Sequence, residues 1–444
     1  MKIVIAGAGE VGSHLAKLLS FENQDIVLVD SDASKLSNID ANYNLMTLVG
    51  RPTSFQTLRD AGVENCDLFI AVTPYESKNV IACSMAKKIG AGKTVARIDN
   101  YEFMNKENRD YFVSMGVDSL IYPEFLAAQE IITALRRPWV RHWFELSNGE
   151  IVLVGVKMRE SSKLIGMQLK ELAAMQPTFH ISAIKRRHNT IIPRGDDYIK
   201  LNDILYFTTT RNHVDDLLEI SGKINYDVKK VMVMGGSRIA IRTVDLAEDE
   251  YKFKIIEQNL DVCQFLAEQC PDCDIVHADA RDIDVLREEG LDEYDAFIAL
   301  TDSSETNILA CIMAKEFGVT KTIAEVENLQ LISEAEGLNI GTTINKKLLA
   351  SSTIFQLLLD ADSSTSKCHS LTDAEVAELE ARPGSKITRG PVKELNLSRE
   401  MTIAGLVRNG EGMLVTGNTQ IQPGDHVVVF CLAGFLHKVE KLFY

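Results

Sequence analysis

Two segments of the chain, 228 residues apart, are close copies of each other. The segment DLFIAVTPYESKNVIACSMAKKIGAGKTVARIDN begins at Asp67, and DAFIALTDSSETNILACIMAKEFGVTKTIAEVEN begins at Asp295. They align without a gap, and 16 of their 34 positions are identical, which is far more than chance gives. The chain is therefore a duplication with two similar halves of roughly 220 residues each.

Short apolar runs alternate with helical stretches in each half. In the first half these runs are IVIA, IVLVD, NLMTLVG, LFIAVT, TVARI and SLIYP. This alternation is typical of a parallel sheet with crossover helices. We therefore predict an α/β protein with two doubly wound, Rossmann-like domains, at residues 1–124 and 228–346.

A glycine-rich turn follows the first predicted strand, Lys2–Ala6. Gly7, Gly9 and Gly12 have the spacing G-x-G-x-x-G, and a helical pattern begins directly after them. Such glycines allow a tight turn, a close approach of the backbone to a pyrophosphate, and close packing of helix on sheet. Asp30 ends the next strand, where a carboxylate can accept hydrogen bonds from ribose hydroxyls and repel a 2′-phosphate. The pattern predicts an NAD-type or adenine nucleotide site.

The second copy of this turn is altered. Gly235 keeps the first glycine, but Ser237 and Ala240 replace the other two. Glu257 takes the role of Asp30, one residue away from the position that the offset of 228 predicts. Arg238 could offset phosphate charge. Ser237 would crowd a pyrophosphate but could also hydrogen-bond it, so this half either binds a nucleotide or is a purely structural copy.

Further candidate residues follow equivalent strands of the two halves. Thr73 and Thr301 lie where the carboxyl ends of a doubly wound sheet bind ligands. Arg97 could meet a phosphate or form a surface ion pair, and its counterpart is Glu325. The predicted nucleotide-binding residues are Gly7, Ala8, Gly9, Glu10, Val11, Gly12, Asp30, Thr73, Pro74, Arg97, Gly235, Gly236, Ser237, Arg238, Ile239 and Glu257.

Each predicted Rossmann-like domain is followed by an amphipathic stretch and a small module. The stretches, Phe125–Leu135 and Leu348–Leu358, are predicted helices that cover their own core, are swapped, or make a dimer. Short β-branched runs separated by turn residues predict compact β-rich α+β modules at residues 140–223 and 364–444. They share patterns such as SSKLIGMQLKEL and GSKITRGPVKEL.

Composition excludes several functions. A net charge of −16 argues against binding nucleic acid or an anionic lipid surface. We expect no signal peptide, because the chain begins with a strand, and no membrane span, because the longest apolar run, VVVFCLAGFL, is too short. The eight cysteines are scattered, which favours reduced thiols. Cys270, Cys273 and His277 resemble part of a zinc site, but a fourth ligand is not evident and we expect no metal.

Catalytic residues are not evident in the sequence. The nine histidines are irregularly spaced, and none has an equivalent in the other half. A dehydrogenase would need an acid/base group and a substrate pocket beside the nicotinamide. We therefore expect a protein that is not an enzyme.

Taken together, these motifs resemble tandem RCK (KTN) domains, and the order of four domains is similar to the TrkA family of regulatory subunits of bacterial Trk potassium uptake systems. The resemblance implies binding of NAD(H), sensitivity to ATP and ADP, and a homo-oligomer, either a dimer or a tetramer. It also implies a cytoplasmic protein, peripheral at the inner face of the cell membrane, with a TrkH/TrkG-like potassium-translocating subunit as partner. Gly50-Arg51-Pro52 departs from the Gly-Asp-Ala that many members carry, whereas Asp279-Ala280 keeps it. An NAD-dependent oxidoreductase, or a regulator of a different transporter or channel, stays open as an alternative.

Overall fold

The computed structural model describes residues 1–20, 24–40, 43, 45–175, 178–187, 189–338, 340–359, 365–370 and 374–444. These residues form two compact units. Unit 1 comprises Met1–Leu126, Lys346–Ser370 and Ala433–Lys441, and unit 2 comprises Ala127–Asn345, Leu371–Leu432 and Leu442–Tyr444.

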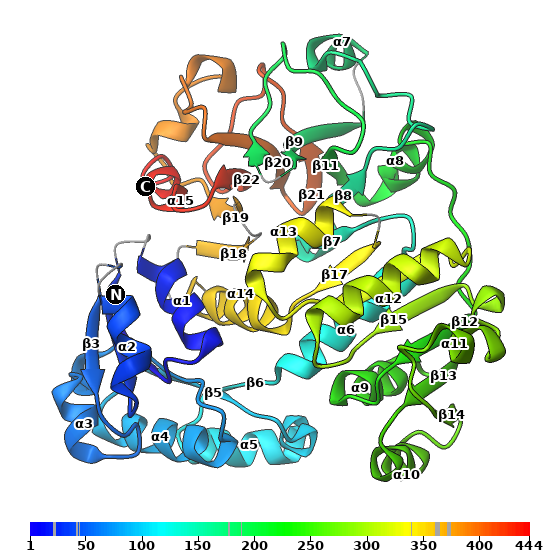
Figure 1. Ribbon diagram of the computed structural model, residues 1–444. Helices are drawn as coiled ribbons and strands as arrows, with labels where there is room; N and C mark the ends of the chain where they lie inside the picture. The colour runs from blue at the N-terminus through cyan, green and yellow to red at the C-terminus, as the bar shows by residue number, and fades with distance from the viewer. Residues whose placement is uncertain are drawn as a thin grey trace. The chain divides into compact units, whose positions relative to one another are not determined.

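Unit 1 contains a six-stranded parallel sheet in the order β3-β2-β1-β4-β5-β6 (Figure 1). Its strands are β1 (Lys2–Ala6), β2 (Asp25–Asp30), β3 (Met46–Val49), β4 (Leu68–Ala71), β5 (Lys93–Arg97) and β6 (Ser119–Ile121). Its helices are α1 (Glu10–Ser20), α2 (Ala33–Asp40), α3 (Phe55–Asp60), α4 (Glu76–Ile89) and α5 (Lys106–Ser114). The strand order reverses between β1 and β4, which is the doubly wound arrangement that the sequence predicts.

Helix α14 (Lys346–Leu359) follows the second sheet in the chain but packs in unit 1. It contacts α1 and β6, and Lys347 forms an ion pair with Glu10 at the start of α1. Strand β18 (Thr365–Ser370) and helix α15 (Leu436–Glu440) belong to the same unit. The helix therefore packs with the Rossmann-like domain of the first half and not with the sheet that precedes it in the chain. This is the swapped arrangement among the options for this amphipathic stretch.

Unit 2 contains the second six-stranded sheet, in the equivalent order β14-β13-β12-β15-β16-β17. Its strands are β12 (Lys230–Met234), β13 (Lys252–Glu257), β14 (Asp274–His277), β15 (Ala296–Ala299), β16 (Lys321–Glu325) and β17 (Thr342–Ile344). Its helices are α9 (Arg238–Ala247), α10 (Leu260–Gln269), α11 (Ile283–Glu288), α12 (Ser304–Glu316) and α13 (Leu329–Gly337). The part of α6 (Pro123–Arg136) beyond Leu126 belongs to this unit, where Arg136 Nε donates to Glu250 Oε2 at 3.1 Å.

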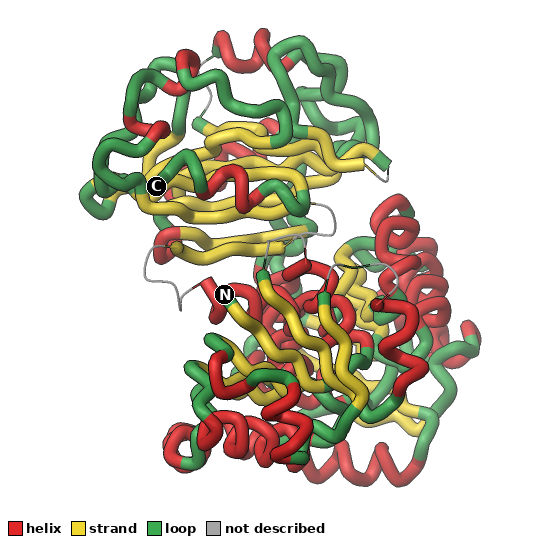
Figure 2. Tube along the Cα trace, turned by 90° about the vertical axis from the view of Figure 1, so that its left-hand side faces the viewer, coloured by secondary structure: helices red, strands yellow, loops and turns green. Residues whose placement is uncertain are grey.

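The first small module and most of the second also lie in unit 2, and both are built from antiparallel strands; Figure 2 draws the strands in yellow. One sheet has the order β10-β9-β11-β8-β7, and its strands are β7 (His142–Leu146), β8 (Ile151–Lys157), β9 (Phe179–Arg186), β10 (Asn189–Ile191) and β11 (Ile204–Thr210). Helices α7 (Leu169–Ala174) and α8 (Val214–Ile220) accompany it. The other module has the order β19-β22-β20-β21, with β19 (Ala374–Glu380), β20 (Met401–Arg408), β21 (Glu411–Leu414) and β22 (His426–Leu432).

The modules share one apolar core and repeat the same buried ion pair. The rings of Tyr206 and Phe430 lie 5.7 Å apart within that core. Arg186 Nη2 donates to Asp203 Oδ2 at 2.7 Å, and Arg408 Nη2 donates to Asp425 Oδ2 at 2.6 Å. The duplication therefore extends through the modules, and the predicted fold class, two Rossmann-like domains with two β-rich modules, is confirmed.

No helix among the described residues is both long enough and apolar enough to cross a membrane.

Candidate nucleotide site

The glycine turn of the first half is held tightly against the sheet. Gly7 has φ +112°, and a Cβ there would lie 3.0 Å from the backbone nitrogen of Thr73. A Cβ on Gly12 would lie 1.8 Å from the carbonyl oxygen of Gly7. A Cβ on Gly9, by contrast, would meet nothing within 4 Å. Two glycines therefore serve the packing of the turn, and the third leaves open space beside the loop.

Asp30 lies at the end of β2 and fixes the same loop. Its Oδ2 accepts a hydrogen bond from the backbone N–H of Ala8 at 2.7 Å, and its Oδ1 accepts one from Asp32 N at 2.9 Å. Each carboxylate oxygen has a further lone pair. Asp30 can therefore hold the loop and still accept a hydrogen bond from a ribose hydroxyl.

A clamp that the sequence prediction did not include joins the ends of β4 and β5. The Oδ1 of Asn79, on α4, accepts hydrogen bonds from Thr73 N at 2.9 Å and Thr73 Oγ1 at 2.6 Å. Its Nδ2 donates to the carbonyl oxygens of Thr73 and Arg97, both at 2.9 Å. Asn307 makes the same four bonds in the second half. The identity of Asn79 and Asn307 in the internal repeat was the signal that could have revealed this clamp.

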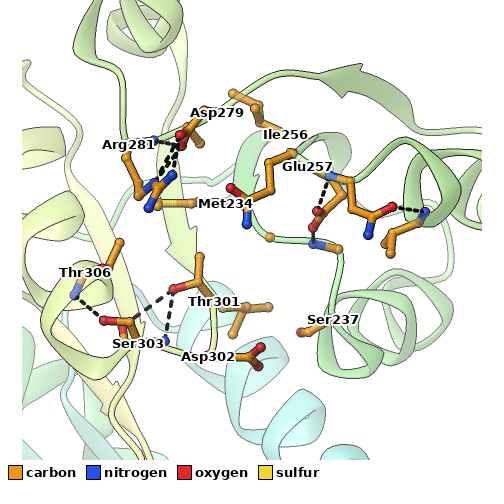
Figure 3. A pocket seen from close by; sticks show the side chains of 17 residues that line it. Met234, Ser237, Ile256, Glu257, Asp279, Arg281, Thr301, Asp302, Ser303 and Thr306 are labelled. Atoms are coloured by element: carbon orange, nitrogen blue, oxygen red, sulfur yellow. Dashed lines mark hydrogen bonds and ion pairs between the residues drawn. The ribbon is translucent and has the colours of Figure 1, made fainter.

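The second half has a cleft of about 450 Å³ at the carboxyl edge of its sheet (Figure 3). Its lining includes the loop residues Gly235, Gly236 and Ser237, and also Glu257 and Thr301. Glu257 Oε2 accepts a hydrogen bond from Gly236 N at 2.7 Å, which repeats the contact between Asp30 and Ala8. The shift of one residue between the copies therefore leaves the geometry of the acid unchanged.

Ser237 and Arg238 do not lie as their residue types suggested. The hydroxyl of Ser237 caps α9, because it accepts a hydrogen bond from Ala240 N at 3.4 Å. Arg238 and Ile239 are not among the residues that line the cleft. The cation on its wall is Arg281, whose guanidinium is bonded to Asp279 at 2.6 Å. Sequence reasoning missed Arg281, although it lies in the loop after the third strand of the half.

The remaining predicted residues lie around the first loop. Ala8 and Val11 are buried, and Glu10 is exposed and paired with Lys347. Pro74 is exposed and follows Thr73, and Arg97 ends β5. The structure therefore brings Gly7 to Gly12, Asp30 and Thr73 together at the carboxyl edge of the sheet.

The cysteine and histidine cluster does not converge on a metal geometry. His277 Nε2 lies 3.1 Å from the carbonyl oxygen of Gln258. Among the described residues there is no group of three or more His, Cys, Asp or Glu side chains that could hold a metal ion.

Both loops suit a nucleotide. The open space at Gly9 and the free lone pairs of Asp30 match a pyrophosphate and a ribose. The cleft of the second half lies within the range of ~300–1,000 Å³ that is usual for ligand pockets.

The TrkA-N domain family matches residues 3–123 and 231–346, and the TrkA-C domain family matches residues 153–222 and 376–444. The chain belongs to the TrkA family. It is 30% identical to the Trk system potassium uptake protein TrkA of Halomonas elongata, over all of this chain and 98% of that protein. It is also 30% identical to a Trk system potassium uptake protein TrkA homolog of Archaeoglobus fulgidus, over the full length of both.

Solved structures share the fold at low sequence identity. The GsuK channel bound to NAD has a TM-score of 0.60 and 14% identity, and the match covers all of this chain and 78% of that one. The crystal structure of the GsuK RCK domain has a TM-score of 0.59 and 14% identity, covering 99% of this chain and 94% of that one. At this identity the similarities show that the chain shares its fold with these structures, one of which is described as an RCK domain.

Proposed function

We propose that this chain is a regulatory subunit of a Trk-type potassium uptake system and that it binds NAD(H) at the glycine turn of its first half. The observation that carries the proposal is the open space at Gly9 beside a carboxylate, Asp30, that keeps acceptor capacity. The proposal is supported by relatives named Trk system potassium uptake protein TrkA over their whole length. A fold neighbour, at 14% identity, is described as bound to NAD.

The second half takes ATP or ADP in this proposal. Its cleft contains Arg281, which can exchange part of its pairing with Asp279 for a phosphate oxygen. The hydroxyl of Ser237 remains with the helix start, and the N–H groups there favour an anion. The two halves would then respond to different nucleotides.

The nucleotide is sensed and not consumed. The nine histidines are irregularly spaced in the sequence and none has an equivalent in the other half, so the two halves share no histidine that could act as the acid or base for hydride transfer. A ligand shifts a conformational equilibrium only by its difference in affinity for the two states, and a coupling of ~1–3 kcal/mol is enough for regulation. A conformational change at the first loop can be transmitted to α14, because Glu10 at the start of α1 is paired with Lys347 of α14.

The proposal includes four domains and an assembly. The domains are the Rossmann-like residues 1–124 and 228–346 and the small modules 140–223 and 364–444. A homo-oligomer, a dimer or a tetramer, would dock from the cytoplasmic side on a TrkH/TrkG-like subunit. Nucleotide exchange would change the shape of this assembly and thereby the flux through the partner.

Calorimetric titration with NADH, NAD, ATP and ADP, followed by small-angle scattering with each nucleotide, tests the proposal. We expect NADH binding, a scattering profile that depends on the nucleotide, and a matching change in potassium flux through a reconstituted partner complex. Turnover of NADH with a defined substrate would contradict it. So would scattering and flux that are indifferent to all four nucleotides.

A further inference from the structure

A second, smaller pocket in unit 2 is surrounded by cations. Its volume is about 190 Å³, and it lies between the first small module and the second Rossmann-like sheet. Six of the residues that line it are basic, and none of these described lining residues is acidic. The six are Arg141, Lys157, Arg159, Lys223, Lys315 and Lys321. This concentration stands out in a chain whose net charge is −16.

The pocket is separate from the nucleotide cleft. Lys321 begins β16 and Thr342 begins β17, so the pocket lies at the amino edge of the sheet. The cleft that contains Thr301 and Glu257 lies at the carboxyl edge. The two share no lining residue.

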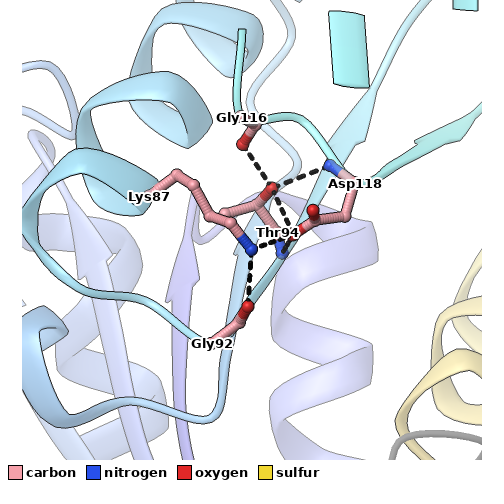
Figure 4. Close-up of polar contacts among 5 residues, drawn as sticks. All are labelled: Lys87, Gly92, Thr94, Gly116 and Asp118. Atoms are coloured by element: carbon pink, nitrogen blue, oxygen red, sulfur yellow. Dashed lines mark hydrogen bonds and ion pairs between the residues drawn. The ribbon is translucent and has the colours of Figure 1, made fainter. Parts of the chain in front are cut away.

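In the first half, a carboxylate lies at the equivalent position. There Lys87 Nζ donates to Gly92 O at 2.6 Å and to Asp118 Oδ2 at 2.8 Å, and Thr94 N donates to the same carboxylate oxygen at 2.8 Å (Figure 4). The carboxylate therefore neutralises the lysine at the amino edge of the first sheet.

The second half keeps the cation and lacks the acid. Lys315 is the repeat equivalent of Lys87, and it donates to Thr320 O as Lys87 does to Gly92 O. Ser119 pairs with Val95, and Thr342 pairs with the equivalent residue Ile323. The residue before each is Asp118 in the first half and Gly341 in the second.

Gly341 cannot be replaced by an acid in this conformation. It has φ +80°, and a Cβ there would lie 2.1 Å from the carbonyl oxygen of Thr322. The local backbone conformation therefore keeps a carboxylate away from this position.

Most partners of the cluster are neutral, and the carboxyl group that faces it, Glu130, lies beside Lys321 and has its pKa raised by burial to about 7. Lys157 Nζ donates to the carbonyl oxygens of Glu336, Gly337 and Leu338 at 3.0–3.2 Å, at the end of α13. Lys321 Nζ donates to Val140 O at 3.1 Å and Thr342 Oγ1 at 3.0 Å. The carboxylate of Glu336 pairs with Lys185 at 2.6 Å, and Lys185 does not line the pocket.

The cations also disfavour one another's charge. Burial, Arg159 and Arg141 lower the pKa of Lys223 to about 8. Burial lowers the pKa of Lys315 to about 8, and the same two arginines and Lys223 contribute. An anion placed among these groups would relieve the repulsion.

We propose that this pocket binds a small polyanion that bears phosphate groups, of the size of pyrophosphate, where the first half has the carboxylate of Asp118. The volume is below the ~300–1,000 Å³ of pockets for organic ligands. Ammonium and guanidinium groups are the usual partners of phosphate oxygens. The half-buried Arg159, Lys223 and Lys315 are the residues that an entering anion would pair with, because the other cations are buried.

Fluorescence titration of the full chain with pyrophosphate tests this proposal. The chain has two tryptophans, Trp139 and Trp143, and Trp139 lines the pocket. We expect saturable binding, with affinity reduced ~10-fold in Lys223→Gln and in Arg159→Gln, because each removes a charged partner. Circular dichroism verifies that each variant is folded.

Two variants serve as controls. Lys87→Gln changes the equivalent lysine in the first half, and Lys163→Gln changes a lysine of the same module that is 66% exposed. Both should bind pyrophosphate as the wild type does. Failure of the wild type to bind pyrophosphate, or equal affinity in all four variants and the wild type, would overturn the proposal.

The phosphate groups could also belong to the tail of a nucleotide. ATP binding that weakens in parallel with pyrophosphate binding in Lys223→Gln would identify that source. ATP binding that is unchanged in Lys223→Gln would identify a free polyanion as the ligand. Either outcome leaves NADH binding at Gly9 untouched, so failure here is distinguishable from failure of the proposed function.

Discussion

The backbone N–H of Ala8 donates a 2.7 Å hydrogen bond to the carboxylate of Asp30, 22 residues further along the chain. Gly236 and Glu257 form the same 2.7 Å bond in the second half. The acid at the end of the second strand thus has a structural role before any nucleotide arrives. It holds the turn in the conformation that exposes the loop.

Gly9→Val should abolish NADH binding in the first half without unfolding the chain. A side chain at this position meets no protein atom within 4 Å at its Cβ, so the fold accepts it, but it fills the space where a pyrophosphate would approach. Calorimetric titration with NADH measures the loss. Gly12→Val is the contrasting variant, because its Cβ would lie 1.8 Å from Gly7 O and should disturb the fold itself. Wild-type affinity in folded Gly9→Val would show that the loop does not bind the cofactor.

Two charged residues near the predicted ribose should change cofactor preference in opposite directions. Asp30 repels a 2′-phosphate, so NADH should bind more tightly than NADPH. Asp30→Asn should reduce this difference in affinity between the two cofactors. Arg51 is the repeat equivalent of Asp279, which lines the second cleft, and a cation there attracts a 2′-phosphate. Arg51→Gln should therefore increase the difference in affinity between NADH and NADPH. Equal binding of both cofactors to the wild type would mean that Asp30 does not face the ribose.

The strands and the turns were predictable because their signals are local. Lys2–Ala6 was predicted as a strand and is β1, and the acidic role of Glu257 followed from its place at the end of an apolar run. Residue type alone was a poorer guide to which side chains face the cleft. Arg238 begins α9 yet does not line the cleft, whereas Arg281 does, since the path of a loop decides which cation faces inward.

Long-range packing set the rest of the structure. The sequence left three options for the helix of Leu348–Leu358, and only the contacts of α14 with α1 and β6 decide among them. The basic pocket could not be found from local patterns either. Its cations come from strands, helices and loops between Arg141 and Lys321, and its acidic counterpart is missing through one glycine, Gly341.

Asn307→Ala should destabilise unit 2 by ~1–3 kcal/mol, because it leaves buried backbone groups of Thr301 and Glu325 without their partner. Asn307 is fully buried, and both tryptophans lie in the same unit, so denaturant unfolding followed by fluorescence reports the change. Leu309→Ala on the same helix is the control, since Leu309 is 60% exposed. Similar stability of the two variants would show that the clamp contributes little.

The buried lysines of the basic pocket should make stability rise with pH above neutrality. Burial first, and then Arg141 and Lys315, lower the pKa of Lys321 to about 7. The same residue has a pKa near 10.4 in the unfolded chain. Between these values the unfolded state binds more protons than the folded state, so the free energy of unfolding increases as pH is raised. Lys157, whose pKa burial also lowers to about 7, acts in the same direction.

Lys321→Met isolates this contribution. The variant should lose up to ~4 kcal/mol of the increase in unfolding free energy between pH 7 and pH 10, measured by denaturant unfolding at each pH. Glu130 faces Lys321, and burial raises the pKa of Glu130 to about 7 whereas Lys321 lowers it. Removing Lys321 therefore raises the pKa of Glu130 further, and the later loss of its proton adds to the difference between the variant and the wild type. Buried thiols such as Cys83, whose pKa burial raises, oppose the trend equally in both proteins. Lys163→Met, at an exposed position, should keep the wild-type slope. Parallel curves for the wild type and Lys321→Met would show that Lys321 keeps an ordinary pKa in the folded chain.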